Sequence, residues 1–174
     1  GQYSLVLLLL SAPVMLLGDS VGEAFYPKIT RAINNQAKNS FSLIKKATLV
    51  LFCVGVLPLG FISAFGNIIL PWVFGNEWEL AGQYSRWVAF WMISVLAVRP
   101  AVAAMPPLKM QSVLLIYEVV ITIFRMAALY LGYIYFNDIY AIAFFSIVNV
   151  IGYIGVWVVV MVKSKRRDKE ISNV

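Results

Sequence analysis

Four polar side chains recur along one face of an otherwise apolar segment, and they are the strongest candidates for chemistry in this sequence. Intervals of seven, four and three residues separate them, so at about 3.6 residues per turn they share one face of a helix. Charged groups in lipid are disfavoured by about 2.5–3.5 kcal/mol each. The stripe therefore predicts either a buried ion pair between helices or the lining of a water-filled transport lumen. Its members are Gln111, Glu118, Thr122 and Arg125.

Two arginines inside apolar segments, Arg99 and Arg125, are candidates for binding an anion. A guanidinium stays charged and can hold a phosphate through two parallel hydrogen bonds. Arg99 lies about 18 Å along its segment from Trp87, which predicts a position near the middle of the bilayer. Glu118 and Arg125 are about 10 Å apart along the helix axis, so we expect each to meet a partner elsewhere, with Arg99 as one candidate. We assign Arg99, Glu118 and Arg125 to a substrate-binding site.

Two carboxylates lie near the inner end of the first apolar segment. Asp19 and Glu23 are four residues apart and therefore share a helical face. Three interpretations fit them: solvation at the membrane surface, pairing with Lys28 or Arg31, or binding of a coupling cation.

Asn149 belongs to a weaker polar stripe in the last apolar segment. It shares a helical face with Ser146 and Tyr153. Asn149 is a candidate for substrate binding, and ordinary hydrogen bonding between helices is the other explanation of the stripe.

The sequence carries no recognisable catalytic, metal or cofactor motif. It contains no histidine, its one cysteine is Cys53, and it lacks a phosphate-binding loop and a dinucleotide glycine motif. We therefore predict a protein that is not an enzyme and needs no cofactor.

The amino-acid composition indicates that these polar residues lie in a membrane protein rather than in a soluble domain. Hydrophobic residues make up 61% of the 174 residues and charged residues 13%, whereas soluble domains have about 45–50% and about 25%. Residues 47–76 and 139–162 contain no charged residue, and each stretch exceeds the roughly 20 residues that cross a bilayer as a helix. The net charge of +6 gathers beside apolar segments, which indicates membrane topology rather than binding of nucleic acid.

Apolar density and turn residues predict an all-α bundle of about five transmembrane helices. Prolines at positions 13, 58 and 100 are expected to kink helices without ending them, and Pro106-Pro107 to form a tight turn. The predicted spans are residues 3–26, 47–71, 84–106, 109–134 and 139–162.

Two polar stretches flank the spans. Residues 28–46 have apolar residues at helical spacing, which fits either a helix lying on the membrane surface or a plain continuation of the first span. Residues 163–174 are expected to be a disordered basic tail.

The distribution of basic residues predicts orientation. Eleven of the fourteen lysines and arginines lie in residues 28–46, at Lys109 and in residues 163–174, whereas Arg86 is the one basic residue in the opposite connections. Because cytoplasmic loops collect lysine and arginine, we expect the N-terminus outside and the C-terminus in the cytoplasm, in an inner (plasma) membrane.

Two stretches resemble segments of a known family. The first is a proline-containing helix, residues 9–27, that runs through Leu17-Gly18 to Phe25-Tyr26-Pro27. The second is similar to an external loop and reads Phe74-Gly75-Asn76-Glu77-Trp78, then Ala81-Gly82-Gln83-Tyr84. The helix that follows, with Arg99-Pro100 and then Lys109-Met110-Gln111, fits the same pattern. Together they resemble the later helices of bacterial O-antigen or exopolysaccharide flippases, in the multidrug, oligosaccharidyl-lipid and polysaccharide exporter superfamily.

The resemblance covers residues 1–120 and implies an alternating-access transporter with two MATE-like lobes. A cationic central cavity would hold the pyrophosphate and sugars of a lipid-linked oligosaccharide. This chain would supply most of the second lobe, with an N-terminal lobe of the same protein before Gly1. The family supplies no proven contact residue, and Glu23 departs from the small polar or glutamine side chain that it has there.

Two alternative functions remain open. One is another exporter of the same superfamily, for drugs or peptidoglycan precursors; cationic cargo would favour carboxylates in the cavity, and anionic cargo would favour arginines. The other is a non-transport membrane component of polysaccharide synthesis, such as a polymerase or a scaffold. A polymerase usually has a large external loop, whereas the longest one expected here has about a dozen residues.

Overall fold

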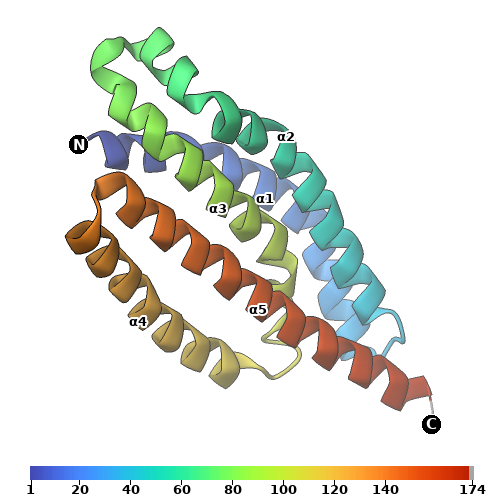
Figure 1. Ribbon diagram of the computed structural model, residues 1–174. Helices are drawn as coiled ribbons and strands as arrows, with labels where there is room; N and C mark the ends of the chain where they lie inside the picture. Colours follow the sequence, from blue (N-terminus) through green and yellow to red (C-terminus); the bar gives the residue numbers. More distant parts are fainter. Residues whose placement is uncertain (173–174) are drawn as a thin grey trace.

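Five long helices joined by short connections form the computed structural model, which describes residues 1–172 (Figure 1). All five are long and apolar enough to cross a membrane, so the predicted all-α bundle is confirmed. A short 3₁₀ turn, η1 (Asn76–Trp78), precedes the third helix. The helices are α1 (Gln2–Asn34), α2 (Ser40–Phe74), α3 (Glu79–Ala104), α4 (Gln111–Tyr135) and α5 (Asp138–Ser172).

Helix α3 is the centre of the bundle. It packs against α1, α2 and α5, whereas α4 lies at the edge and packs on α5 (Figure 1). The share of buried residues in the most apolar part of each helix follows this arrangement, with 50% for the span of α3 and 11% for that of α4. Most of the α4 surface is therefore free to meet lipid or other protein.

Small residues bring neighbouring helices into backbone contact. A Cβ atom on Gly82 of α3 would lie 2.8 Å from the Cα of Asn67 and 2.9 Å from the carbonyl oxygen of Gly66, both in α2. A Cβ on Gly132 of α4 would lie 2.5 Å from the Cα of Ala141 in α5. Within a membrane, helices associate through such close van der Waals packing because lipid tails remove the usual hydrophobic driving force.

The prolines behave as the sequence predicts, but the ends of the helices do not. Pro13, Pro58 and Pro100 lie inside helices, and the turn at Pro106-Pro107 separates α3 from α4. The surface helix considered for residues 28–46 is wrong, because α1 continues to Asn34 and α2 begins at Ser40. The connection between α2 and α3 is likewise only Gly75–Trp78, shorter than the dozen residues expected.

The connections gather at two ends of the bundle (Figure 1). At one end lie the α1–α2 turn, the α3–α4 turn and the last residues of α5, and we call this the basic end. The N-terminus and the connection before α3 lie at the other end, the acidic end, where the Gln2 side chain donates a 2.7 Å hydrogen bond to the carbonyl of Glu77 and accepts one of 2.8 Å from the amide of Ala81. The connections alternate between the two ends because consecutive helices run in opposite directions.

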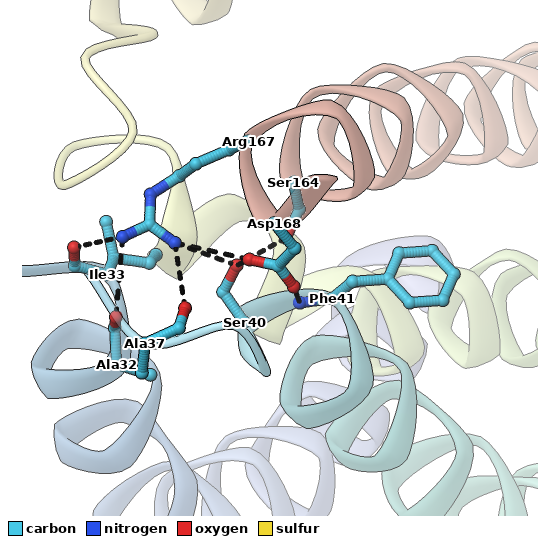
Figure 2. A network of polar contacts seen from close by, with 8 residues as sticks. All are labelled: Ala32, Ile33, Ala37, Ser40, Phe41, Ser164, Arg167 and Asp168. Atoms are coloured by element: carbon cyan, nitrogen blue, oxygen red, sulfur yellow. Dashed lines mark hydrogen bonds and ion pairs between the residues drawn. The ribbon is translucent and has the colours of Figure 1, made fainter. Parts of the chain in front are cut away.

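The disordered tail predicted for residues 163–174 is wrong over the described part of the chain. Helix α5 runs without a break to Ser172, and residues 173–174 lie outside the described residues. Two neighbouring charged residues, Arg167 and Asp168, bind the α1–α2 turn from α5 (Figure 2). The basic sequence therefore continues a membrane helix and fastens it to another part of the fold.

Each member of the Arg167–Asp168 pair caps a different helix. The Arg167 guanidinium donates hydrogen bonds to the last carbonyl groups of α1, including Ile33, and to the carbonyl of Ala37 at 3.2 Å. The Asp168 carboxylate accepts hydrogen bonds from the Phe41 amide at 2.9 Å and from the Ser40 hydroxyl, at the start of α2 (Figure 2). A cation thus meets the negative end of one helix dipole and an anion meets the positive end of the next.

We expect the Asp168→Ala variant to unfold more easily, because it exposes the first amides of α2 and leaves Arg167 without its carboxylate. The loss should be about 1–3 kcal/mol and is measured as a lower midpoint of thermal unfolding in detergent. Lys165→Ala, which truncates an exposed neighbour on the same helix, is the matched control. An equal midpoint for both variants would contradict the capping role.

Candidate functional site

The Arg99 guanidinium of α3 pairs with the Asp19 carboxylate of α1. Their Nη1 and Oδ1 atoms are 3.0 Å apart, and the side chains are 28% and 72% exposed respectively. Asp19 is therefore neither simply solvated nor paired with Lys28 or Arg31 in this structure. The pair joins helices α1 and α3 through two residues that are 80 positions apart in the sequence.

Gly18 makes room for this ion pair. A Cβ atom at Gly18 would overlap the Arg99 guanidinium, so the arginine lies across the bare backbone of α1 and reaches the next residue, Asp19. Glycine is the one residue that leaves space for such a close approach. The local sequence Gly18-Asp19 thus supplies both a groove for the arginine and its counter-ion.

Arg99 lies close to the C-terminal end of α3, and its depth in the bilayer stays a prediction. It is five residues before the end of α3 at Ala104, which is about 7 Å along the axis. Its neighbour Val98 belongs to the same core cluster as Val156 of α5, and Lys163 follows Val156 by about 10 Å. Arg99 is therefore displaced from the middle of helix α3 toward the basic end.

The second ion pair joins two residues of the same helix. Arg125 Nη1 and Glu118 Oε2 of α4 are 3.4 Å apart, and the side chains are 17% and 49% exposed respectively. The expectation that these residues are too distant to pair is wrong, because two long side chains that lean toward each other can bridge the seven-residue interval. Arg99 is not their partner.

Two of the three guanidinium nitrogens of Arg125 are buried without a hydrogen bond of normal geometry within the described chain. Its Nε and Nη2 atoms are buried and have no hydrogen-bond partner among residues 1–172. The planar group also lies over the Tyr153 ring of α5, with Cζ 5.9 Å from the ring centre. Nε and Nη2 form the side-on edge that binds a carboxylate or a phosphate in bidentate fashion. The nearby hydroxyl of Tyr117 is buried without a partner as well.

The polar stripe and an apolar groove occupy different sides of α4. Gln111, Glu118 and Thr122 are exposed. Val120, which is about 200° around the helix from Glu118, lines a groove of about 540 Å³ between α4 and α5. This groove is almost purely hydrophobic, so it suits acyl chains or apolar side chains. The charged chemistry of α4 is confined to the stripe.

Asn149 faces the interior of the chain rather than a surface. Its side chain is buried, and its amide donates a 2.8 Å hydrogen bond to the carbonyl of Phe145 one turn earlier. Ser146 bonds to Ile142 in the same way at 2.7 Å. These bonds satisfy polar groups within α5. A part for Asn149 in substrate binding stays a prediction.

The two carboxylates considered for ion coupling remain one turn apart on α1. Glu23 is exposed and forms no ion pair with any of residues 1–172, whereas Asp19 is held by Arg99. No group of three or more histidine, cysteine or acidic side chains gathers within the described part of the chain. A cation at Asp19 would have to compete with Arg99, so coupling also stays a prediction.

Several of these contacts could not be seen in the sequence. The spacing of Gly18 and Gly22 beside Asp19 and Glu23 is the one local signal for a close helix contact at the first pair. The sequence pattern predicts hydrogen bonding for Tyr153 and gives no sign that its ring lies against Arg125. Nothing in the basic composition of residues 163–170 separates Arg167 from its solvated neighbours.

Comparisons of the chain with family profiles, with curated proteins and with solved structures found no match. The class of protein therefore follows from the fold and from the charges within it. Five long apolar helices define an integral membrane protein. Two ion pairs within its candidate spans distinguish it from a bundle with only apolar contacts.

We expect Gly18→Ala to displace Arg99 and to break its pair with Asp19. The overlap should lower stability by roughly 1–3 kcal/mol, measured by thermal unfolding in detergent. Adding Asp19→Asn to Gly18→Ala should then change little, because both substitutions remove the same contact.

Gly155→Ala is the control for this experiment. Gly155 is also in a helix, but a Cβ there meets no atom within 4 Å, so this variant should keep or slightly raise the stability. Fully additive effects of Gly18→Ala and Asp19→Asn would mean that Arg99 does not depend on the space above Gly18.

Proposed function

We propose that this protein is a membrane transporter that flips polyprenyl-pyrophosphate-linked oligosaccharides for cell-surface polysaccharide synthesis. In this proposal the chain forms most of one lobe of a MATE-like, alternating-access transporter. The substrate carries two linked phosphates, so a basic site inside the membrane is the first requirement. The resemblance of residues 9–27 and 74–84 to polysaccharide flippases supports the same function.

The unpaired edge of Arg125 is the observation that carries the proposal. Leaving a buried donor without a partner is unfavourable by about 1–3 kcal/mol, and more for a charged group. Water or an anion at Nε and Nη2 would remove this penalty. A phosphate oxygen pair fits the edge because it accepts two parallel hydrogen bonds. Glu118 holds the opposite side of the guanidinium and so keeps the free edge in place.

The exposed stripe on α4 supports a second set of helices. Glu118 and Thr122 would otherwise face lipid, where a charge is disfavoured by about 2.5–3.5 kcal/mol. An N-terminal lobe of the same protein would cover the stripe and enclose water and substrate between the lobes. Alternating access then opens this space to one side of the membrane at a time.

Arg99 takes a related role in this proposal. Its carboxylate partner, Asp19, is well exposed, so an incoming phosphate can replace Asp19 without first opening a buried pair. Asp19 and Glu23 would then be free to bind a proton or a cation. Release of Asp19 by substrate gives one physical route by which cargo and coupling ion could be linked.

A second candidate is an exporter of cationic drugs. In both ion pairs the carboxylate is more exposed than the arginine, 72% against 28% for the first and 49% against 17% for the second. A positively charged cargo would meet Asp19 and Glu118 before the arginines. This observation favours the alternative within the same superfamily, and transport assays with both cargo types separate them.

Orientation is part of the proposal. The basic end of the bundle would lie in the cytoplasm and the acidic end outside the plasma membrane, because lysine and arginine collect in cytoplasmic connections. Helix α5 would then carry its last turns, from Lys163 to Ser172, into the cytoplasm.

Labelling of single cysteines tests this orientation. In a Cys53→Ser background, we expect Glu77→Cys to react with a membrane-impermeant maleimide on intact cells and Lys165→Cys to react only after permeabilisation. Both positions are exposed in the structure, so a lack of reaction reports the membrane rather than burial. Labelling of Lys165→Cys on intact cells would reverse the topology.

Transport by charge variants of the full-length protein tests the function. Arg125→Lys keeps the charge but removes the side-on edge, so flipping of lipid-linked oligosaccharide should fall by about tenfold, the effect of about 1.4 kcal/mol. The double variant Glu118→Gln, Arg125→Gln should also lose transport. The measurement is flipping in reconstituted vesicles at matched protein content.

Arg86→Lys is the control for the Arg125 variants, because Arg86 is exposed at the acidic end and has no part in the proposed site. It should transport normally. Normal flipping by Arg125→Lys and by the double variant would exclude the anion-binding role. Transport of a cationic dye that falls with Asp19→Asn, with no oligosaccharide flipping, would favour the drug exporter instead.

A further inference from the structure

A polar hollow of about 450 Å³ opens at the basic end of the bundle. Its volume is within the roughly 300–1,000 Å³ typical of sites for small ligands. Three separate parts of the chain form its walls: the end of α1 with the α1–α2 turn, the α3–α4 turn, and the last turns of α5. The polar lining residues are Asn34, Gln36, Lys109, Lys163, Arg167 and Glu170.

The charges around the hollow suit a singly charged anion. Lys109, Lys163 and Arg167 supply three positive charges, while Glu170 in the wall and Asp168 beside Arg167 supply two negative ones. The formal sum is +1. Arg167 is already engaged with Asp168 and the α1 carbonyls (Figure 2). The two lysines form no ion pair with any of residues 1–172, so their ammonium groups are free to bind.

Two residues in the walls of the hollow have a left-handed backbone conformation, which glycine adopts more easily than residues with a Cβ atom. Gln36 and Lys109 have φ angles of 53° and 57°, and they are the positive-φ residues other than glycine in the described chain. This left-handed conformation is unfavourable by roughly 1–2 kcal/mol for a residue with a Cβ. Both turns place their strained residue in the wall of the same hollow.

The sequence of α5 suggests how deep the hollow would lie if the helices cross a bilayer. Lys163 is the first charged residue after the charge-free stretch of α5, residues 139–162. Apolar residues Ile33, Pro107 and Leu108 complete the wall. Basic pockets between membrane helices at this depth are suited to anionic headgroups. A second hollow of about 410 Å³ shares Gln36, Arg167 and Glu170 and extends the space toward the end of α5.

We propose that this hollow binds the phosphodiester headgroup of an anionic phospholipid from the leaflet at the basic end. Lys109 and Lys163 bind the phosphate from two sides, and Glu170 accepts hydrogen bonds from headgroup hydroxyls. The bound lipid joins the α3–α4 turn to α5 and to the α1–α2 turn. This binding site is separate from the arginines within the spans and does not depend on the transported substrate.

Lipid titration of the purified protein tests the site. The probes are dioctanoyl phosphatidylglycerol, dioctanoyl phosphatidylcholine and inorganic phosphate, and the readouts are the dissociation constant and the thermal midpoint. Phosphatidylglycerol should bind and raise the midpoint, whereas the other two probes should bind at least tenfold more weakly. For Lys109→Gln with Lys163→Gln, the affinity for phosphatidylglycerol should fall at least tenfold.

Lys165→Gln with Lys169→Gln is the matched control, since it removes the same charge from residues outside the hollow and should change the affinity less than threefold. Lys109→Gly separates binding from folding. It relieves the left-handed backbone, so without lipid its midpoint should not fall, yet its affinity for phosphatidylglycerol should fall, by less than in the double variant.

Three outcomes would overturn the proposal. Equal losses in the two double variants would show that binding follows overall charge. Equal binding of phosphatidylcholine would show that the anionic headgroup is not recognised. Inorganic phosphate binding as tightly as phosphatidylglycerol would assign the hollow to a free anion rather than to a lipid.

Discussion

A polar group inside a bilayer has no water to bond with, so it must find its partner within the protein or in something that the protein binds. The five helices meet this constraint for the backbone. Polar side chains meet it in three ways. Hydroxyls and amides such as Asn149 donate hydrogen bonds to carbonyl groups of their own helix. Arginines within the candidate spans pair with a carboxylate, and Arg167 donates hydrogen bonds to the free carbonyl groups at the end of a neighbouring helix.

The parts of the fold that could be predicted from sequence are those that depend on local chemistry. A run of apolar residues longer than the bilayer thickness predicts a span whatever surrounds it, and Pro106-Pro107 marks a turn by its own geometry. The ends of the helices were missed because they depend on contacts across the fold. Residues 163–170 have the composition of a solvated tail, yet Arg167 and Asp168 find the α1–α2 turn and become ordered helix. Composition does not reveal which charges have a partner.

The candidate site also has features that the sequence predicts and features that depend on contacts between helices. Sequence periodicity placed Glu118 and Arg125 on one face of a helix, and their ion pair confirms it. The prediction that Arg99 is charged within the membrane stays a prediction. The sequence did not identify the ion-pair partner of either arginine. The Asp19–Arg99 pair needs α1 and α3 to approach closely at Gly18, which is a tertiary feature. The Glu118–Arg125 pair was excluded by counting axial rise alone, which ignores the length and direction of the side chains.

A comparison of Arg125 with Arg167 shows why the two arginines are assigned different purposes. The Arg167 guanidinium donates to three carbonyl groups, a hydroxyl and a carboxylate, so its bonding capacity is used by the fold (Figure 2). Arg125 has one carboxylate contact at 3.4 Å and leaves two buried nitrogen atoms unpaired among residues 1–172. Had Arg125 served only to hold α4 against α5, a methionine or leucine of similar volume would pack there without the desolvation penalty. Retaining a cation with two buried, unpaired nitrogen atoms is unfavourable for the isolated chain, and in the proposed function an anion at these atoms removes that penalty. The two arginines therefore differ in how many of their donors the fold uses, and an anion-binding role for Arg125 belongs to the proposed function.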